Sequence, residues 1–519
     1  MPAEPKSMTE PQPGAETTTE SLSLLDRIAV EGKIGQTDQE RSAGKLWLKD
    51  LVQDVMTGQM TVSKDTEAMI NSRIAELDAL ISRQLNEVLH SEPFQKLEGS
   101  WRGLHYFVMQ TETSSSLKIK LMNISKTDLF KDLDKAIEFD QSAIFKKIYE
   151  EEYGTLGGNP FGALIGDYEF GRHPQDIALL EKMSGVAADS HAPFIAAGTP
   201  ALFNFDSFTE LAGPRDLEKI FDNEAYLKWN MFRKSDDSRY VGLCLPHVLM
   251  RLPYGKETTP VEEFDYEEGV DGRDHSKYLW GNAAYAFGAR LTDAFARHEW
   301  CAAIRGVEGG GLVEGLPAHT FITDDGDVAT KCPTEIAITD RRENELAKLG
   351  FIPLCYYKGT DTAVFMGAQS TQKPQVYLDS DATANARLST QLQYIMACSR
   401  FAHFLKVMMR DKIGSFMSRD QCEAFLNKWI ANYVLLDDMA PQDLKAKFPL
   451  RDARIEVAEI AGKPGVVYRR RFLASAFSVG RVEGFVASGG KITGWEGLTN
   501  RLARFGCVIC NARCKNYGL

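Results

Sequence analysis

The stretch "NPFGALIGDYEFGRHPQDIALLEKMSGVAADSHAPFIAAG", residues 159–198, says most about the fold of this chain. Residues 161–170 form a short apolar run with turn residues at both ends, which predicts a strand. The residues that follow Pro174 predict a helix, and a second apolar run around Phe194 predicts another strand. A strand, a helix and a strand in this order predict a βαβ-like unit.

Segments on both sides of this unit predict further helices and strands, and therefore a mixed α+β fold. Residues 65–90 carry apolar side chains three or four positions apart, which is typical of a helix with one packing face. Residues 116–125 alternate between apolar and polar side chains and predict a strand, and so do residues 451–468, which run on into a turn. Several short strands and many turns are expected over 240–375, and helices over 388–436.

The length and net charge of the chain indicate an acidic protein with more than one domain. A chain of 519 residues is too long for a single hydrophobic core. Its net charge of −12 argues against non-specific nucleic-acid binding, which needs a basic surface. No long apolar run predicts a membrane span, and the first residues lack the apolar core of a signal peptide, so we expect a cytoplasmic protein.

The motifs of common enzymes are absent from the sequence. There is no Walker A run, and the glycines of 157–171 and 306–317 lack the spacing and partner residues of a phosphate site. His298 and Glu299 do not extend to a zinc-protease motif. Asp167 and Glu169 can share one face of a strand and do acid–base work, although such pairs are common at strand ends. The sequence therefore predicts a structural role with no catalytic, cofactor-binding or metal-binding residues.

Cys507, Cys510 and Cys514 crowd together near the end of the chain, whereas the other cysteines lie far apart. Three cysteines resemble part of a zinc site, which needs a fourth ligand, and no histidine follows His403. We expect buried, reduced thiols and no metal.

Longer segments carry a resemblance to a known family. The stretch of 159–198 resembles the large sheath subunit of type VI secretion systems, the TssC/VipB family. Further resemblance runs in the same order through "FQKLEGSWRGLHYFV" (94–108), "SDDSRYVGLCLPHVLMRLPYG" (235–255), "YLWGNAAYAFGARLTDAF" (278–295), "PTEIAITDRRENELAKLGFIPL" (333–354) and "LSTQLQYIMACSRFAHFLKVMMRDKIGS" (388–415). The resemblance runs from about residue 20 to 467, which is most of the chain.

The resemblance implies a structural protein that catalyses nothing. Family members pair with a small sheath subunit of the TssB/VipA family and stack as a helical sheath around an inner tube of the Hcp family, on a baseplate. Contraction of the extended sheath then ejects the inner tube. The family's strands also join neighbouring subunits by strand pairing. The alternative is a phage-tail-like contractile sheath protein that is not recycled by an unfoldase.

An apolar-striped helix is expected near the N-terminus, after a disordered tail. In "ESLSLLDRIA", the side chains of Leu22, Leu25 and Ile28 fall on one helical face. The helix can dock on its own domain or lie in a partner's groove. In the family that the chain resembles, a helix at this position is captured by the AAA+ unfoldase ClpV. The resemblance therefore implies that these three residues bind the unfoldase.

The resemblance ends before the last residues of the chain. The predicted organisation is a tail and short helix in 1–45, an N-terminal sheath domain in 46–375, a C-terminal sheath domain in 376–467 and an atypical tail in 468–519. The tail holds nine Lys or Arg and two Glu, whereas the rest of the chain is acidic. One inserted base near codon 469 turns a family-like ending into runs such as Arg469-Arg470-Arg471. We therefore hypothesise a shifted reading frame.

Overall fold

The computed structural model describes residues 38–56 and 66–459, except for 263, 273, 324, 413, 416–417 and 438. It also describes four segments nearer the C-terminus, which are 467–475, 478–487, 491–492 and 505–511. The chain divides into two compact units, Met1–Ile81 and Ser82–Leu519. The predicted helix with Leu22, Leu25 and Ile28 lies outside the described residues. The predicted boundaries after residues 45, 375 and 467 stay predictions.

The first unit contains α2 (Asp38–Met56) and most of α3 (Thr66–Leu89), the helix predicted over 65–90. The apolar stripe of α3 was expected to be a packing face. Its side chains are nevertheless about half exposed in the described part of the chain, for example 47% for Ile70 and 49% for Ile74. Leu46 and Trp47 on α2 are exposed as well. Exposed apolar stripes of this kind are typical of a surface that another chain covers.

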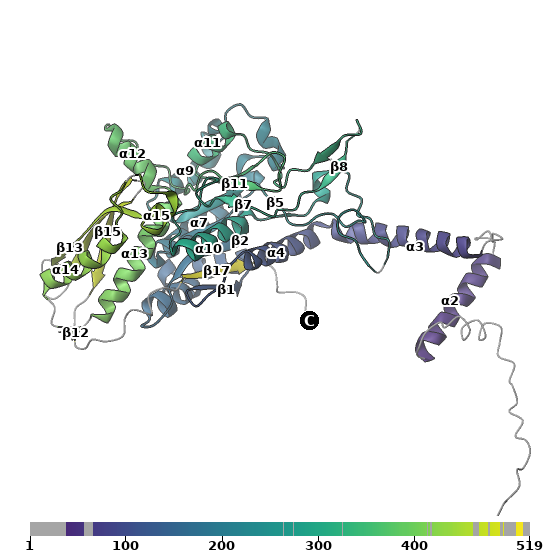
Figure 1. Cartoon of the computed structure of the whole chain (residues 1–519), viewed down its shortest axis with the longest axis horizontal. Helices are drawn as coiled ribbons and strands as arrows, with labels where there is room; N and C mark the ends of the chain where they lie inside the picture. Colours follow the sequence, from purple (N-terminus) through teal and green to yellow (C-terminus); the bar gives the residue numbers. More distant parts are fainter. Residues whose placement is uncertain are drawn as a thin grey trace, which may run out of the picture. The chain divides into compact units, whose positions relative to one another are not determined.

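An eight-stranded sheet forms the centre of the second unit (Figure 1). Its strand order is β1-β17-β2-β3-β4-β10-β11-β7. The strands from β1 to β10 in this order run parallel, whereas β11 and β7 are antiparallel to their neighbours. The bounds are β1 (Leu117–Asn123), β2 (Phe161–Phe170), β3 (Phe194–Gly198), β4 (Val241–Leu245), β7 (Leu312–Val313), β10 (Ile352–Tyr356), β11 (Ala363–Phe365) and β17 (Phe505–Asn511).

The predicted βαβ unit is confirmed as β2, α7 (Pro174–Ser190) and β3. Pro174 occupies the first turn of α7, where its missing N–H costs nothing. His191 ends the helix in the left-handed conformation, with φ of 52°. The two strands pair in parallel, with Leu164 opposite Phe194.

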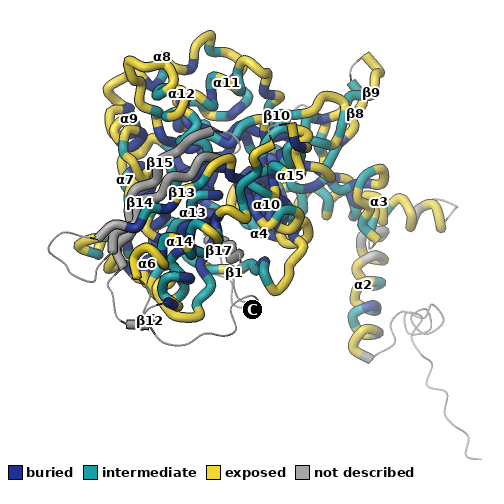
Figure 2. Tube along the Cα trace, turned by 60° about the vertical axis from the view of Figure 1, so that its left-hand side comes forward, coloured by how far each residue is buried: buried dark blue, intermediate teal, exposed yellow. Residues whose placement is uncertain are grey.

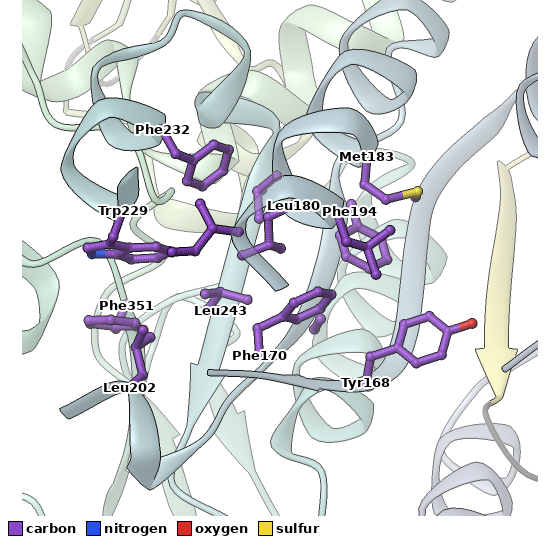
Figure 3. Packing of buried hydrophobic residues seen from close by; sticks show 14 of the residues in the cluster. Tyr168, Phe170, Leu180, Met183, Phe194, Leu202, Trp229, Phe232, Leu243 and Phe351 are labelled. Carbon is purple, nitrogen blue, oxygen red and sulfur yellow. The ribbon is translucent and has the colours of Figure 1, made fainter. Parts of the chain in front are cut away.

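Alternate residues of the central strands feed two separate hydrophobic cores. Leu164, Phe194 and Leu243 pack with α7 and with Trp229, whose ring stacks on Phe351 at 5.9 Å (Figure 3). Their neighbours Ile165, Ile195 and Cys244 pack instead with α10 (Ala283–His298) and with α4 (Glu92–Met109). Because successive strand residues point to opposite faces, α7 and α10 cover opposite faces of the sheet. Figure 2 shows the buried residues gathered in this interior.

Glycine allows α10 to lie very close to the sheet. A Cβ atom at Gly288 would come within 2.3 Å of Cδ1 of Ile165. A Cβ at Gly103 of α4 would come within 2.4 Å of the Tyr285 ring on α10. A larger residue at Gly288 or Gly103 would therefore require the neighbouring side chains to shift.

The remaining described helices and strands complete the second unit. A third core gathers Phe401, Leu405, Leu426, Ile430 and Ile455 beneath a three-stranded antiparallel sheet. That sheet consists of β13 (Leu450–Glu459), β14 (Val467–Ser475) and β15 (Ser478–Ala487), and the helices near it are α12 (Ser380–Ser389), α13 (Leu392–Asp411), α14 (Arg419–Ile430) and α15 (Gln442–Lys447). The shorter elements are α5 (Lys126–Lys135), α6 (Ala143–Phe145), a π-helix (Lys146–Gly154), α8 (Glu218–Phe221), α9 (Leu227–Lys234), α11 (Asp340–Lys348), β5 (Val248–Leu249), β6 (Trp280–Gly281), β8 (Thr320–Ile322), β9 (Val328–Thr330), β12 (Gly414–Ser415) and β16 (Lys491–Ile492). Single 3-10 turns cover Phe139–Gln141, Pro200–Phe203, Phe208–Ala212, Glu224–Tyr226, Asp237–Tyr240, His275–Lys277 and Ala431–Tyr433.

The predicted α+β class is confirmed, and so are the strands at 116–125 and 451–468 as β1 and β13. The expectation for 240–375 was incomplete, because α10 and α11 lie among the short strands there. Residues 283–292 of α10 are all buried, so this part of the helix lacks the alternation of buried and exposed faces that reveals a surface helix.

Candidate functional site

A pocket of about 330 Å³ lies at the carboxyl end of β2, where the sequence places its two carboxylates. Asp167 and Glu169 both line it, as expected for strand residues two positions apart. Lys96 and Ser100 of α4 and Lys126 of α5 complete its polar wall. In α/β proteins the carboxyl ends of parallel strands are common ligand sites, so the chemistry of this pocket decides between a catalytic site and a scaffold.

The carboxylate of Asp167 has a strongly raised pKa. Burial raises its pKa to about 6 and outweighs hydrogen bonding to Ser100, while the charge of Glu169 raises it further. Its buried Oδ2 has no hydrogen-bond partner among the described residues. A carboxylate with such a pKa is a candidate acid–base group, provided that a reacting partner lies nearby.

Glu169 is held by histidine rather than free for chemistry. Nε2 of His247 lies 3.2 Å from Oε1 of Glu169, and Nδ1 of His247 lies 2.6 Å from Oε2 of Glu335. Burial by itself would lower the pKa of His247, but hydrogen bonds to the two carboxylates and their charges raise it to about 10. The imidazole therefore carries a charge at neutral pH and bridges the end of β2 to the segment around residue 335.

The other groups of this cluster are also committed to structure. Glu335 accepts hydrogen bonds from the Ser207 hydroxyl at 2.7 Å and from the backbone N–H of Phe208 at 3.1 Å. Lys126 pairs with Asp176 of α7 at 2.7 Å and donates to the carbonyl oxygen of Glu169 at 2.6 Å. These contacts join loops that are distant in sequence, which is what a scaffold requires.

A second charged cluster lies where α3 and α4 meet the loop after β5. The guanidinium of Arg251 bonds both carboxylate oxygens of Glu268, at 2.5 and 3.0 Å, and Oε1 of Glu98 at 2.9 Å. His90 and the backbone N–H of Tyr254 contact the same Glu268 carboxylate, at 3.0 and 2.9 Å. Only 6% of the Arg251 side chain and 1% of the Glu268 side chain are exposed. Such a buried and multiply bonded pair fixes the loop in one conformation.

Neither cluster has a metal site or a reactive cysteine among the described residues. Among them there is no group of three His, Cys, Asp or Glu side chains that could hold a metal. Burial raises the pKa of Cys244, and it raises that of Cys301 to about 12, which leaves both thiols protonated and unreactive. The buried thiols expected from the sequence are confirmed at Cys244, Cys301 and Cys422, whereas Cys332, Cys355 and Cys398 are only half-buried.

The other sequence candidates have structural positions where the structure describes them. Gly306 and Gly310 of the glycine-rich stretch adopt φ of 73° and 83°, which only a turn with glycine accommodates readily. His298 is the last residue of α10, and Glu299 ends that helix with φ of 65°. The backbone of 505–511, which includes Cys507 and Cys510, forms β17 between β1 and β2, whereas Cys514 lies outside the described residues.

Sequence reasoning did not find His247, Arg251, Glu268 or Glu335. Each is an isolated charged residue, and the partners of His247 lie 78 and 88 residues away. No spacing rule links residues so far apart. The one usable signal was the presence of His247 and Arg251 in the otherwise apolar run of 241–252, where a charge needs a buried partner.

No helix in the described ranges combines the length and the apolar character that crossing a bilayer requires.

Comparisons with known proteins match almost the whole chain. Residues 71–372 match a family model described as "EvpB/VC_A0108, tail sheath N-terminal domain", and residues 381–484 match "EvpB/VC_A0108, tail sheath gpW/gp25-like domain". A curated protein of Pseudomonas aeruginosa, "Type VI secretion system sheath protein TssC1", is 48% identical over 476 residues. That similarity covers 91% of this chain and 95% of the relative.

Proposed function

We propose, from the premise that this chain belongs to the TssC/VipB family of type VI secretion sheath proteins, that it pairs with a small sheath subunit and polymerises around an inner tube. The family is structural, so the chain is a structural protein and not an enzyme. The observation that carries the proposal is the pair of tail sheath matches, which follow one another over residues 71–484.

Features of the described residues support an assembly role. The charged groups at the end of β2 pair mainly with one another, which suits a rigid building block. On α2 and α3, Trp47 is 71% exposed and several other large apolar side chains are about half exposed. Covering such side chains with another chain is worth about 25 cal/mol for each Å² of apolar surface removed from water. We propose that α2 and α3 contribute to the contacts between sheath subunits.

In the proposed cycle, the sheath assembles extended on a baseplate around an Hcp-type inner tube. It then contracts and drives that tube outward. The driving energy would be the difference between two packings of the same subunits, as in other bistable assemblies. A ClpV-type unfoldase would then recycle the contracted sheath in the cytoplasm.

Co-expression with the small sheath subunit tests the proposal directly. We expect the two chains to co-purify, because paired sheath subunits bury surface that is apolar in the isolated chain. A variant in which residues 468–519 are replaced by the matching segment of the P. aeruginosa relative is expected to form long tubules in negative-stain micrographs. Tubules from this variant but not from the native chain would locate an assembly defect in the tail. If neither form co-purified with the small subunit, the proposal would be wrong.

The unfoldase proposal concerns the N-terminal stripe of Leu22, Leu25 and Ile28. We expect Leu25→Asp to weaken binding of the ClpV N-terminal domain at least tenfold, because an apolar groove cannot solvate the new carboxylate. Fluorescence anisotropy with the full-length chain measures this. Ser23→Asp adds the same charge away from the stripe and is expected to bind like the native chain. Equal affinity for Leu25→Asp and the native chain would reject the assignment of this stripe, whereas no binding by the native chain would favour the alternative of a phage-tail-like sheath without unfoldase recycling.

A further inference from the structure

The sheet β13-β14-β15 has two outer strands, and their edges differ. A strand at the edge of a sheet presents unpaired N–H and C=O groups that another chain can pair with. Within the described residues β15 pairs only with β14, and β13 pairs with β14 along its length. Alternate residues of β13 direct their backbone groups away from β14, because this is how antiparallel ladders are built.

Side chains of α14 occupy the outer edge of β13. Oδ1 of Asn427 accepts from the backbone N–H of Ile455 at 2.9 Å, and Nδ2 of Asn427 donates to the carbonyl oxygen of the same residue at 2.8 Å. One turn earlier on α14, Oε2 of Glu423 accepts from the backbone N–H of Val457 at 3.1 Å. The Asn427 amide thus makes the donor–acceptor pair that a neighbouring strand would make.

The helix that carries these side chains is firmly positioned. Ser418 and Gln421 form a complete capping box at its N-terminus, which satisfies two otherwise unpaired N–H groups. Leu426 and Ile430 pack into the same core as Ile455. Nδ2 of Asn427 also donates to the carbonyl oxygen of Glu423 at 3.0 Å, which orients the amide before it meets β13.

The covered edge would otherwise be well suited to strand pairing. Ile455 and Val457 are β-branched, and such residues favour extended strands. Two copies of the chain could place their β13 edges side by side in antiparallel orientation, since identical edges are then complementary. At the start of β13, the backbone N–H of Leu435 donates a hydrogen bond to the carbonyl oxygen of Leu450 at 2.8 Å.

We propose that Asn427 and Glu423 close the β13 edge against pairing with a second copy of this chain. The inference rests on the proposed function, polymerisation into a sheath, together with the strand pairing between subunits that the family resemblance implies. With this edge closed, a second copy of the chain cannot extend the sheet through β13, and growth of the sheet on that side is prevented.

Asn427→Leu in the full-length chain tests the closure. Leucine has the same branched arrangement of side-chain heavy atoms, but it bonds neither the N–H nor the carbonyl oxygen of Ile455, so we expect the Ile455 amide to exchange hydrogen at least about tenfold faster. We also expect more self-association than in the native chain by sedimentation velocity. Asn432→Leu makes the same replacement at an exposed position whose side chain bonds none of the described residues, and it is expected to behave like the native chain.

Two results would overturn the proposal. One is unchanged exchange at Ile455 in Asn427→Leu, and the other is faster exchange without additional self-association. If Asn427→Leu fails to fold, judged by circular dichroism, Glu423→Leu opens only the Val457 amide and leaves the Asn427 bonds in place. The same two measurements then apply to Val457. Neither measurement uses the small sheath subunit, so failure here is distinguishable from failure of the proposed function.

Discussion

Replacing Arg251 with methionine is expected to lower the local stability around residues 250–270 by about 3–5 kcal/mol. The guanidinium is the shared partner of Glu98 and Glu268, and the Glu268 side chain is only 1% exposed. Methionine fills much of the volume but leaves the buried Glu268 carboxylate without its main counter-charge. The cost comes from that poorly compensated charge, since the His90 ring and the backbone N–H of Tyr254 remain as its partners but do not replace the guanidinium.

Native-state hydrogen exchange at residues 250–270, together with the thermal denaturation midpoint, measures this loss. Arg239→Met is the matched control, because Arg239 pairs with Asp236 at 3.2 Å while the Asp236 side chain is 85% exposed. Exposed pairs contribute about 0–1 kcal/mol, so the control should change little. If both variants changed stability equally, the cluster around Glu268 would be a surface feature and not the anchor that we infer.

The sequence predicted the parts of the fold that local patterns encode. The βαβ unit at 161–198 was recognisable because two apolar runs and a helix follow one another without interruption. The pattern failed for α10, whose residues 283–292 are all buried, so that no exposed polar face marks the period of this stretch. It also could not reveal that β17, the last described strand, lies between β1 and β2.

For the candidate site, too, the sequence predicted some residues but not the contacts that they make. The two carboxylates of β2 were found from the sequence, and a scaffold role was expected for them. Their environment was not predictable, since His247 reaches Glu169 only after β2 and β4 are placed in one sheet with β3 between them. Long-range charge pairs depend on the tertiary structure, and no spacing in the sequence encodes them. The same holds for Asn427 and the edge of β13, which are 28 residues apart.

His247→Gln is expected to remove a pH-dependent contribution to stability on the order of 3–5 kcal/mol. In the folded chain, Glu169 and Glu335 raise the pKa of His247 to about 10, compared with 6.5 for an ordinary histidine. A raised pKa means that the folded state binds the proton more tightly than the unfolded state. The contribution is therefore complete below about pH 6.5 and is lost as the pH rises toward about 10. Glutamine can donate one hydrogen bond to a carboxylate but supplies no charge at any pH.

Thermal denaturation midpoints of the native chain and His247→Gln, followed from about pH 6.5 to 10, should therefore converge as the pH rises. At acid pH, protonation of Glu169 and Glu335 ends the stabilisation by the bridge. Burial would raise the pKa of Glu169 and of Glu335, but hydrogen bonds and charge from His247 lower both, so their contribution is lost only as the pH falls below the ordinary glutamate range. His298→Gln is the control, because burial lowers the pKa of His298, so that this ring does not titrate toward the alkaline end of the interval. A constant difference between the native chain and His247→Gln across this interval would show that His247 is neutral when folded, and the charged bridge between β2 and residue 335 would have to be abandoned.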